Sequence, residues 1–186
     1  MDIRIQKLEP GNYYHIYNRG INGEETFSNK DNFDFFLSKV QKFISPYFEI
    51  FSYCLMSNHF HFLLSPIEVK DKVFSSESGL HSAEQFYSKQ IGKLINSYSQ
   101  AYNKITNRQG PLFESPFKRK LVKSEDQLKK LLLYIHNNPR DLGFQPKDYK
   151  YCSYVEIISN RTLLVSKESI KWFDNLDNYI FCHDRL

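Results

Sequence analysis

Residues 47–65, YFEIFSYCLMSNHFHFLLS, contain two apolar and aromatic runs that are joined by the short polar pair Ser57-Asn58. Runs of this length that are rich in aromatic residues favour strands, and a short polar connection between two of them is typical of an antiparallel hairpin. We therefore expect strands from Tyr47 to Met56 and from His59 to Ser65, both in the centre of a sheet.

The segments on either side of this hairpin predict further strands and helices. The expected strands are Tyr13 to Arg19 and Phe117 to Lys123, and the expected helices are Asp31 to Ile44, a segment along the apolar stripe Ile91 to Tyr102, and a third helix from Ser124 to about Asn138. Apolar residues recur at helical spacing, Ser124 to Gln127 form a capping box, and Pro139 disfavours helical geometry in the residue before it. Helices that alternate with hairpin-linked strands predict an α+β fold, a ferredoxin-like antiparallel sheet with helices on one face.

The composition is that of a folded protein and excludes a disordered chain. Of the 186 residues, 41% are hydrophobic, 25% are charged and 16% are aromatic, and this length suits one domain with a sizeable core. The aromatic rings can fill that core or stack on unpaired bases, and composition leaves both uses open. No apolar stretch is long enough for a signal peptide or a membrane span, which predicts a cytoplasmic protein without a membrane partner.

Positive charge is concentrated in one part of the chain. Between Lys93 and Lys123 there are seven Lys or Arg residues and one acidic residue, Glu114. The net charge of this stretch, 7 − 1 = +6, exceeds the net charge of the whole chain, +4. Such a run can bind phosphates, although a solvated surface is the commoner explanation of a charge run taken by itself.

The strongest local pattern is the pair of histidines in the second strand of the hairpin. Side chains alternate along a strand with a period of two, so His59 and His61 share one face while Phe60, Phe62 and Leu64 occupy the other and pack under helices. Two imidazoles presented together on a rigid strand favour a metal site. Ordinary half-buried histidines that hydrogen-bond to their neighbours are the alternative for an isolated H-x-H pattern.

A second pair of polar residues lies at the end of the third expected helix. Tyr134 and Asn138 are one helical turn apart and therefore share a side of that helix. Taken without other information, packing at the edge of the core explains the tyrosine, and a helix stop before Pro139 explains the asparagine.

Motifs in five places resemble those of the HUH single-tyrosine transposases and, within them, the REP-associated tyrosine transposase branch. They are Y-H-I-Y-N-R-G at Tyr14 to Gly20, Y-C-L-M-S-N-H-F-H-F-L-L at Tyr53 to Leu64, G-P-L-F-E-S-P-F-K at Gly110 to Lys118, Y-I-H-N-N-P at Tyr134 to Pro139 and Y-C-S-Y at Tyr151 to Tyr154. Ser57 departs from the pattern, because these proteins often have Pro there. We expect residues 1–186 to form one transposase-type catalytic domain with an unassigned C-terminal extension from about residue 155.

The resemblance implies a metal-dependent enzyme that cleaves and rejoins single-stranded DNA, beside a hairpin, through a 5′-phosphotyrosine intermediate. It implies that His59, His61 and Asn138 bind a divalent metal and that a helix brings the nucleophile, Tyr134, to the histidine strand. Two imidazoles and an amide oxygen are softer ligands than the all-oxygen shells that magnesium prefers, which favours manganese or another transition ion. The resemblance permits magnesium as well, so both ions remain candidates.

The remaining expectations concern the nucleic acid. Arg19, Lys118, Arg119 and Lys120 are the candidates for contacts to DNA phosphates, and both a monomer and a homodimer remain open. The alternative function is a non-catalytic nucleic-acid-binding module, because ferredoxin-like sheets with exposed aromatic rings and basic flanks also bind RNA. No RNP-type motif of such modules is present in the sequence. Convergence of the two histidines with Asn138, which a mere binder does not require, would favour the enzyme.

Overall fold

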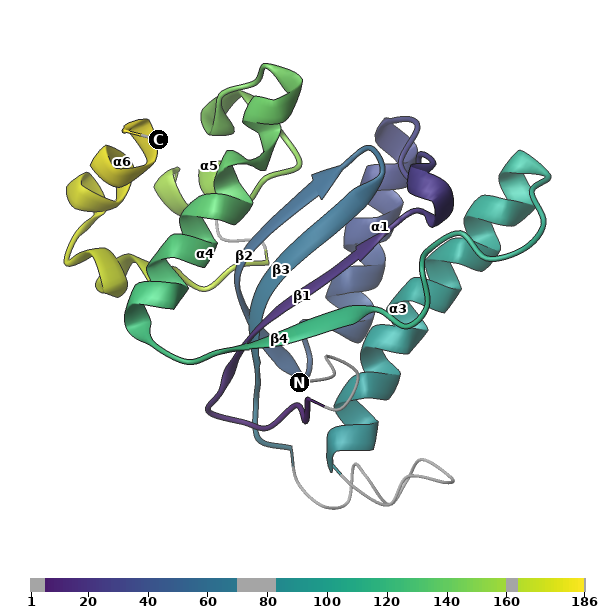
Figure 1. Ribbon diagram of the computed structural model, residues 1–186, viewed down its shortest axis with the longest axis horizontal. Coiled ribbons are helices and arrows are strands. Elements are labelled where there is room, and N and C mark those ends of the chain that lie inside the picture. Colours follow the sequence, from purple (N-terminus) through teal and green to yellow (C-terminus); the bar gives the residue numbers. More distant parts are fainter. Residues whose placement is uncertain (1–5, 70–82, 160–163, 186) are drawn as a thin grey trace.

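The sheet contains the four expected strands, but the first strand of the hairpin lies at its edge and not in its centre as expected. Its apolar residues are nevertheless buried, because the segment around Cys152 covers this edge. The computed structural model describes residues 6–69, 83–159 and 164–185. Its strands are β1 (Tyr13–Arg19), β2 (Phe48–Met56), β3 (His59–Pro66) and β4 (Lys118–Val122). They lie in the order β2-β3-β1-β4, and every neighbouring pair is antiparallel, as Figure 1 shows. Together with a helix after β1 and another after β3, this is the predicted ferredoxin-like α+β arrangement.

Two helices cover one face of this sheet. They are α1 (Lys30–Phe43) and α3 (Ala83–Thr106), which pack against each other. Phe36 of α1 connects the layers, because its ring centroid lies 5.2 Å from that of Phe60 in β3 and 5.1 Å from that of Tyr98 in α3. All three rings are buried. The apolar side of β3 therefore faces these helices, as the alternation of its sequence predicts.

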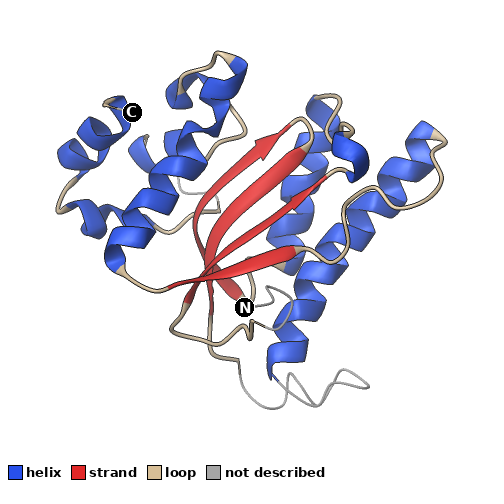
Figure 2. Ribbon diagram, viewed as in Figure 1, coloured by secondary structure: helices blue, strands red, loops and turns tan. Residues whose placement is uncertain are grey.

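A third helix lies on the opposite face. This helix is α4 (Glu125–Asn137), which packs mainly against β2 and β3 (Figure 2). The Ser124 hydroxyl accepts a hydrogen bond from the backbone N–H of Gln127, and the Gln127 side chain accepts one from the backbone N–H of Lys123. These bonds satisfy amide groups at the helix start, as expected from the capping box. The prediction of helices on one face thus holds for α1 and α3, and α4 is the helix that approaches the histidine strand.

The chain after α4 folds back against that helix. Its short elements, in which η denotes a 3-10 helix, are η2 (Asn138–Leu142), η3 (Pro146–Asp148), α5 (Tyr154–Ile158), η4 (Lys167–Phe173) and α6 (Leu176–Asp184). One more 3-10 helix, η1 (Ile21–Gly23), follows β1 near the other end of the sequence. Both η4 and α6 contact α4, and η4 includes residues 169–173, for which the sequence predicts a short helix. The Ser, Lys and Glu residues of segment 68–82 predict a loop, and most of this segment lies outside the described residues. Within the described part of the chain, no helix combines the length and the apolar character that crossing a membrane requires.

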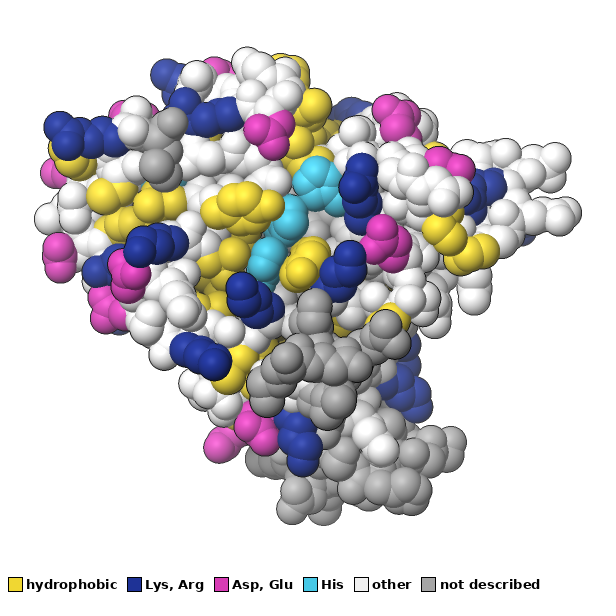
Figure 3. Space-filling view, in the orientation of Figure 1, with side chains coloured by type: hydrophobic (Ala, Val, Ile, Leu, Met, Phe, Trp, Pro, Cys, Tyr) yellow, Lys and Arg dark blue, Asp and Glu magenta, His cyan; other side chains and the backbone are white. Residues whose placement is uncertain are grey.

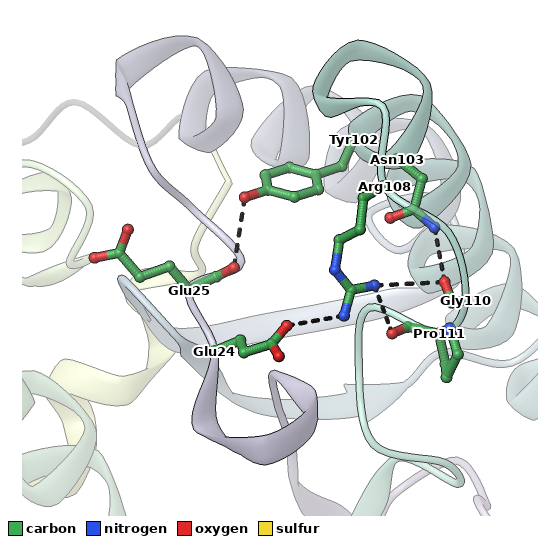
Figure 4. A network of polar contacts seen from close by, with 7 residues as sticks. All are labelled: Glu24, Glu25, Tyr102, Asn103, Arg108, Gly110 and Pro111. Carbon is green, nitrogen blue, oxygen red and sulfur yellow. Dashed lines mark hydrogen bonds and ion pairs between the residues drawn. The ribbon is translucent and has the colours of Figure 1, made fainter.

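A polar network holds the loop that leads from α3 to β4 (Figure 4). The Arg108 guanidinium donates to the carbonyl oxygen of Pro111 at 2.7 Å and pairs with the Glu24 carboxylate at 2.9 Å. The Asn103 side chain donates to the carbonyl oxygen of Gly110 at 2.8 Å. Gly110 has a φ of 86°, a left-handed conformation that favours glycine. Arg108 belongs to the basic stretch of the sequence, and its guanidinium stabilises the loop that leads into β4.

Candidate active site

The two histidines of β3 lie together on the face that α4 approaches. The His59 and His61 ring centroids are 5.0 Å apart. In the register of the sheet, His61 is opposite Tyr17 of β1, and His59 is opposite Arg19. The side chains of Tyr17 and Arg19 therefore lie on the same face of the sheet as those of the two histidines. Figure 3 shows histidine side chains at the surface, with Lys and Arg side chains close by.

The end of α4 brings two further residues to the histidines. The Tyr134 ring stands edge-on to His61, with 5.5 Å between the ring centroids, and is 53% exposed. The Asn138 Oδ1 lies 3.4 Å from the Nε2 of His59. Among the described residues, none hydrogen-bonds to the Tyr134 hydroxyl. The structure therefore brings His59, His61, Tyr134 and Asn138 into one cluster with an open phenolic oxygen at its edge.

Hydrogen bonds orient His59 and Asn138 so that two electron pairs face each other. The Nδ1 of His59 lies 2.6 Å from the Asn58 Oδ1, which can only accept, so Nδ1 carries the proton and Nε2 carries the lone pair. The Asn138 Nδ2 donates to the backbone carbonyl of Tyr134 at 2.7 Å, which turns its Oδ1 towards His59. Two acceptors 3.4 Å apart repel unless a cation lies between them. This donor set fits a metal ion.

His61 contacts His15, a residue of β1, and this contact is compatible with the tautomer that binds a metal. The Nε2 of His15 lies 2.8 Å from the Nδ1 of His61. Burial, followed by nearby positive charge, lowers the pKa of His15 to about 4 and that of His61 to about 3, so both rings are neutral near pH 7. When the Nδ1 of His61 donates to His15, the lone pair of His61 lies on Nε2, the atom through which imidazole commonly binds metals.

The described residues contain no group of three or more His, Cys, Asp or Glu side chains arranged to hold a metal. Besides the two imidazoles, the side-chain atom of this cluster that could donate to a cation is the amide oxygen of Asn138. Two neutral imidazoles and one amide carry no negative charge. A bound divalent cation would keep its full charge for a substrate phosphate.

Basic side chains of β4 lie beside this cluster, and the alternation of the strand decides which of them share its face. Lys118 and Lys120 of β4 lie opposite Tyr17 and His15 of β1, which puts both on the histidine face. The Lys118 Nζ contacts the Glu114 carboxylate at 2.9 Å and lies 6.0 Å from the centroid of the Tyr17 ring.

A cavity of about 380 Å³ is lined by polar and aromatic side chains from three strands and α4. Its lining residues are Tyr17, Asn18, Arg19, Asn58, His59, His61, Lys118 and Tyr134.

Arg119 is the one predicted site residue that the structure does not bring to the cluster. It lies between Lys118 and Lys120 on β4, so its side chain points to the other face of the sheet. It is only 9% exposed, and its guanidinium donates to the Ser88 hydroxyl at 2.8 Å and to the carbonyl oxygen of Gln6 at 3.3 Å. Arg119 therefore joins β4 to α3 and the N-terminal segment, and it does not share a face with Lys118 and Lys120, together with which it was expected to contact DNA phosphates.

Three residues beside the cluster were not singled out from the sequence: His15, Tyr17 and Asn58. The first two could have been found, because Tyr13 to Arg19 alternates and His15, Tyr17 and Arg19 must share one face. Only the register of β1 against β3, however, shows that this face adjoins the histidines. Asn58 was treated as part of the turn, and its contact with the neighbouring His59 ring depends on the turn geometry.

Comparisons with known proteins add one finding about the fold. No family model matches the chain, and no curated protein matches it. Among solved structures, the chain is similar to a REP-associated tyrosine transposase bound to a REP hairpin, with a TM-score of 0.61 over 86% of this chain and 86% of that chain. The two sequences are 13% identical over this match. The chain has the α+β fold of that transposase.

Proposed function

We propose that this protein is a metal-dependent, single-tyrosine enzyme of the transposase type that cleaves and rejoins single-stranded DNA. The observation that carries the proposal is the convergence of His59 and His61 of β3 with Asn138 and an exposed tyrosine, Tyr134, from the end of α4. The shared fold with a REP-associated tyrosine transposase supports it. Because that transposase is bound to a hairpin, the proposed substrate is hairpin-bearing single-stranded DNA.

In this proposal the Nε2 atoms of His59 and His61 and the Oδ1 of Asn138 hold Mg²⁺ or Mn²⁺. The cation would offset charge on the nonbridging oxygens of the scissile phosphate. In this proposal Asn58 keeps the proton of His59 on Nδ1, and His15, as the acceptor in its contact with His61, does the same for His61. The borderline-soft imidazole nitrogens favour Mn²⁺ over Mg²⁺.

Tyr134 is the proposed nucleophile. Its phenolic oxygen gives up its proton and forms a bond to phosphorus while the bond from phosphorus to the 3′ oxygen breaks, and the 3′ oxygen takes up a proton and leaves as a hydroxyl. The product is a 5′-phosphotyrosine, which keeps one phosphodiester bond for each one broken. A 3′ hydroxyl of DNA can therefore reverse the step and rejoin a strand without a nucleotide cofactor.

The open part of the histidine face is the proposed path of the DNA strand. Arg19, Lys118 and Lys120 line or border it and are the proposed phosphate contacts, while the Tyr17 ring offers a surface on which a base can stack. Glu114 holds Lys118 when no DNA is present. A phosphate can take its place because exposed ion pairs are weak.

Changing Lys118 and Lys120 together to Ala is expected to weaken binding of single-stranded DNA and to flatten its salt dependence. Each lost phosphate contact should reduce the slope of log affinity against log salt by about 0.7. Fluorescence anisotropy across a salt series measures this slope. The matched control replaces Lys42 and Lys104, exposed lysines of α1 and α3, and should leave the slope unchanged. An equal effect of both double variants would mean that only overall charge matters.

Changing His15 to Leu is expected to weaken Mn²⁺ binding by about 10- to 100-fold, as loss of a partner to a ligating histidine commonly does. Leu cannot accept the proton that His61 carries on Nδ1, whereas Gln can. His15→Gln should therefore keep most of the affinity. Isothermal titration calorimetry measures both variants, and equal affinities for His15→Leu and the wild type would remove His15 from the site.

The experiment that separates the enzyme from a non-catalytic binding module uses a labelled single-stranded oligonucleotide with a hairpin. With Mn²⁺ present, a denaturing gel should show a band of protein joined covalently to DNA, together with the released fragment that ends in a 3′ hydroxyl. A fully paired duplex of the same sequence should give neither. Tight binding of the hairpin without any covalent product would favour the binding module.

A further inference from the structure

On the side of α4 that faces away from the histidine strand, a chain of buried hydrogen bonds connects this helix to the C-terminal segment. His136 lies midway between Tyr134 and Asn138 in the sequence, about 200° around the helix from each. It is fully buried, and its Nδ1 lies 2.9 Å from the Nε2 of His183 in α6. One helix thus carries two site residues on one side and a contact to the C-terminal segment on the other.

The backbone carbonyl of Tyr179 sets the direction of the hydrogen bond between the two histidines. The Nδ1 of His183 contacts the backbone carbonyl of Tyr179 at 2.7 Å, and a carbonyl only accepts, so the Nε2 of His183 is an acceptor. His136 therefore donates from Nδ1 to His183. Its Nε2 then accepts from the Ser153 hydroxyl at 2.8 Å, and the carbonyl oxygen of Tyr53, 3.2 Å from the same hydroxyl, is a longer second acceptor. The Tyr179 hydroxyl, 3.1 Å from the Nδ1 of His136, is a second and longer contact.

The far end of the chain is anchored in the sheet. The Ser153 hydroxyl oxygen accepts a hydrogen bond from the backbone N–H of Tyr53 in β2 at 2.8 Å. A single series of hydrogen bonds therefore runs from α6 through α4 and the start of α5 to the strand beside β3. Burial of neutral groups in such a series makes each bond costly to lose, because no water replaces it.

Arg140 makes a second tie at the end of α4. Its Nε donates to the side-chain oxygen of Asn137, and its Nη2 donates to the backbone carbonyl of His183 at 3.1 Å. Asn137 and Arg140 flank Asn138 in the chain. The C-terminal segment therefore contacts α4 both at His136 and just beyond Asn138.

We propose that α6 is a positioning element, which through His183 fixes the rotation of α4 and so presents Tyr134 and Asn138 to His59 and His61. This gives a role to the C-terminal extension. The positioning itself stands on the hydrogen bonds of α4, and only its consequence for metal affinity rests on the proposed function. His183 is a positioning residue and contacts neither the metal site nor the DNA path.

The test compares His183→Leu, which removes the acceptor for His136, with His183→Gln, which keeps an acceptor. Hydrogen exchange measured by mass spectrometry reports on α4 without metal or DNA. In His183→Leu, exchange should be faster in segment 125–142 and unchanged in the hairpin, segment 48–66. Mn²⁺ affinity by calorimetry should fall by about 2- to 30-fold, the range for residues that act on a site through packing. His183→Gln should recover most of both losses.

Two further variants complete the design. Phe181→Ala changes an exposed ring of α6 outside the chain of hydrogen bonds, and it should match the wild type in both assays. Arg140→Lys keeps the charge but loses the planar fork, and it should give a smaller effect of the same kind. If His183→Leu does not fold, Arg140→Lys decides the question.

Unchanged exchange in segment 125–142 would overturn the proposal, and so would faster exchange that is equal in segment 48–66, which indicates general destabilisation. A wild type that binds no Mn²⁺ would instead contradict the proposed metal site. The exchange comparison would still decide the role of α6.

Discussion

Tyr134→Phe is expected to abolish DNA cleavage and the covalent adduct while leaving the fold, metal binding and DNA binding intact. Phe keeps the ring that lies edge-on to His61 and removes only the oxygen proposed to attack phosphorus. Because Tyr134 is 53% exposed and its hydroxyl has no hydrogen-bond partner among the described residues, the loss of folding free energy should stay within about 0.5 kcal/mol.

Denaturing gels with a hairpin-bearing oligonucleotide measure the loss of cleavage, and thermal unfolding measures stability. Tyr151→Phe is the matched control, because this ring stacks on Phe33 of α1, beside the opposite face of the sheet. Its cleavage rate should equal that of the wild type. Cleavage that survives in Tyr134→Phe would assign the attack to another tyrosine or to water.

His59→Leu is expected to reduce Mn²⁺ affinity by more than about 100-fold, beyond the loss typical of a partner that does not itself touch the metal. Leu fills much of the space of the imidazole but offers no electron pair opposite the Asn138 oxygen. Cleavage should fall with metal occupancy, whereas metal-free DNA binding should persist. Calorimetry for Mn²⁺ and anisotropy for DNA separate these outcomes.

Asn138→Ala provides the companion measurement. It removes the amide oxygen and leaves both imidazoles, so a smaller loss of Mn²⁺ affinity than in His59→Leu is expected. If either variant binds Mn²⁺ as tightly as the wild type, the ion does not lie between His59 and Asn138, and the proposed ligand set is wrong.

The fold could be predicted because each element has a strong local pattern. The hairpin, the capping box at Ser124 and the stop at Pro139 place β2, β3 and α4 close to their observed ends. The two histidines and the α4 pair, Tyr134 and Asn138, are likewise local patterns, set by periods of two and of one helical turn. Their convergence in space was expected only from the family resemblance.

What could not be predicted depends on register and on contacts between distant segments. Arg119 was grouped with Lys118 and Lys120 as one basic run, although alternation in a strand separates it from both. His136 was part of a quoted motif, yet its partner, His183, lies 47 residues further along the chain. No local pattern signals such a contact, so the role of the C-terminal segment emerges only from the packing of α6 on α4.

The most direct test of the proposed mechanism is to map the residue that becomes joined to DNA. Wild-type protein would be incubated with Mn²⁺ and a hairpin-bearing single-stranded oligonucleotide, digested with nuclease and protease, and analysed by mass spectrometry. The peptide that contains Tyr134 should carry the 5′-phosphate of the DNA remnant. A remnant on any of the other tyrosines, or cleaved DNA without any attached peptide, would contradict the assignment of Tyr134 as the nucleophile.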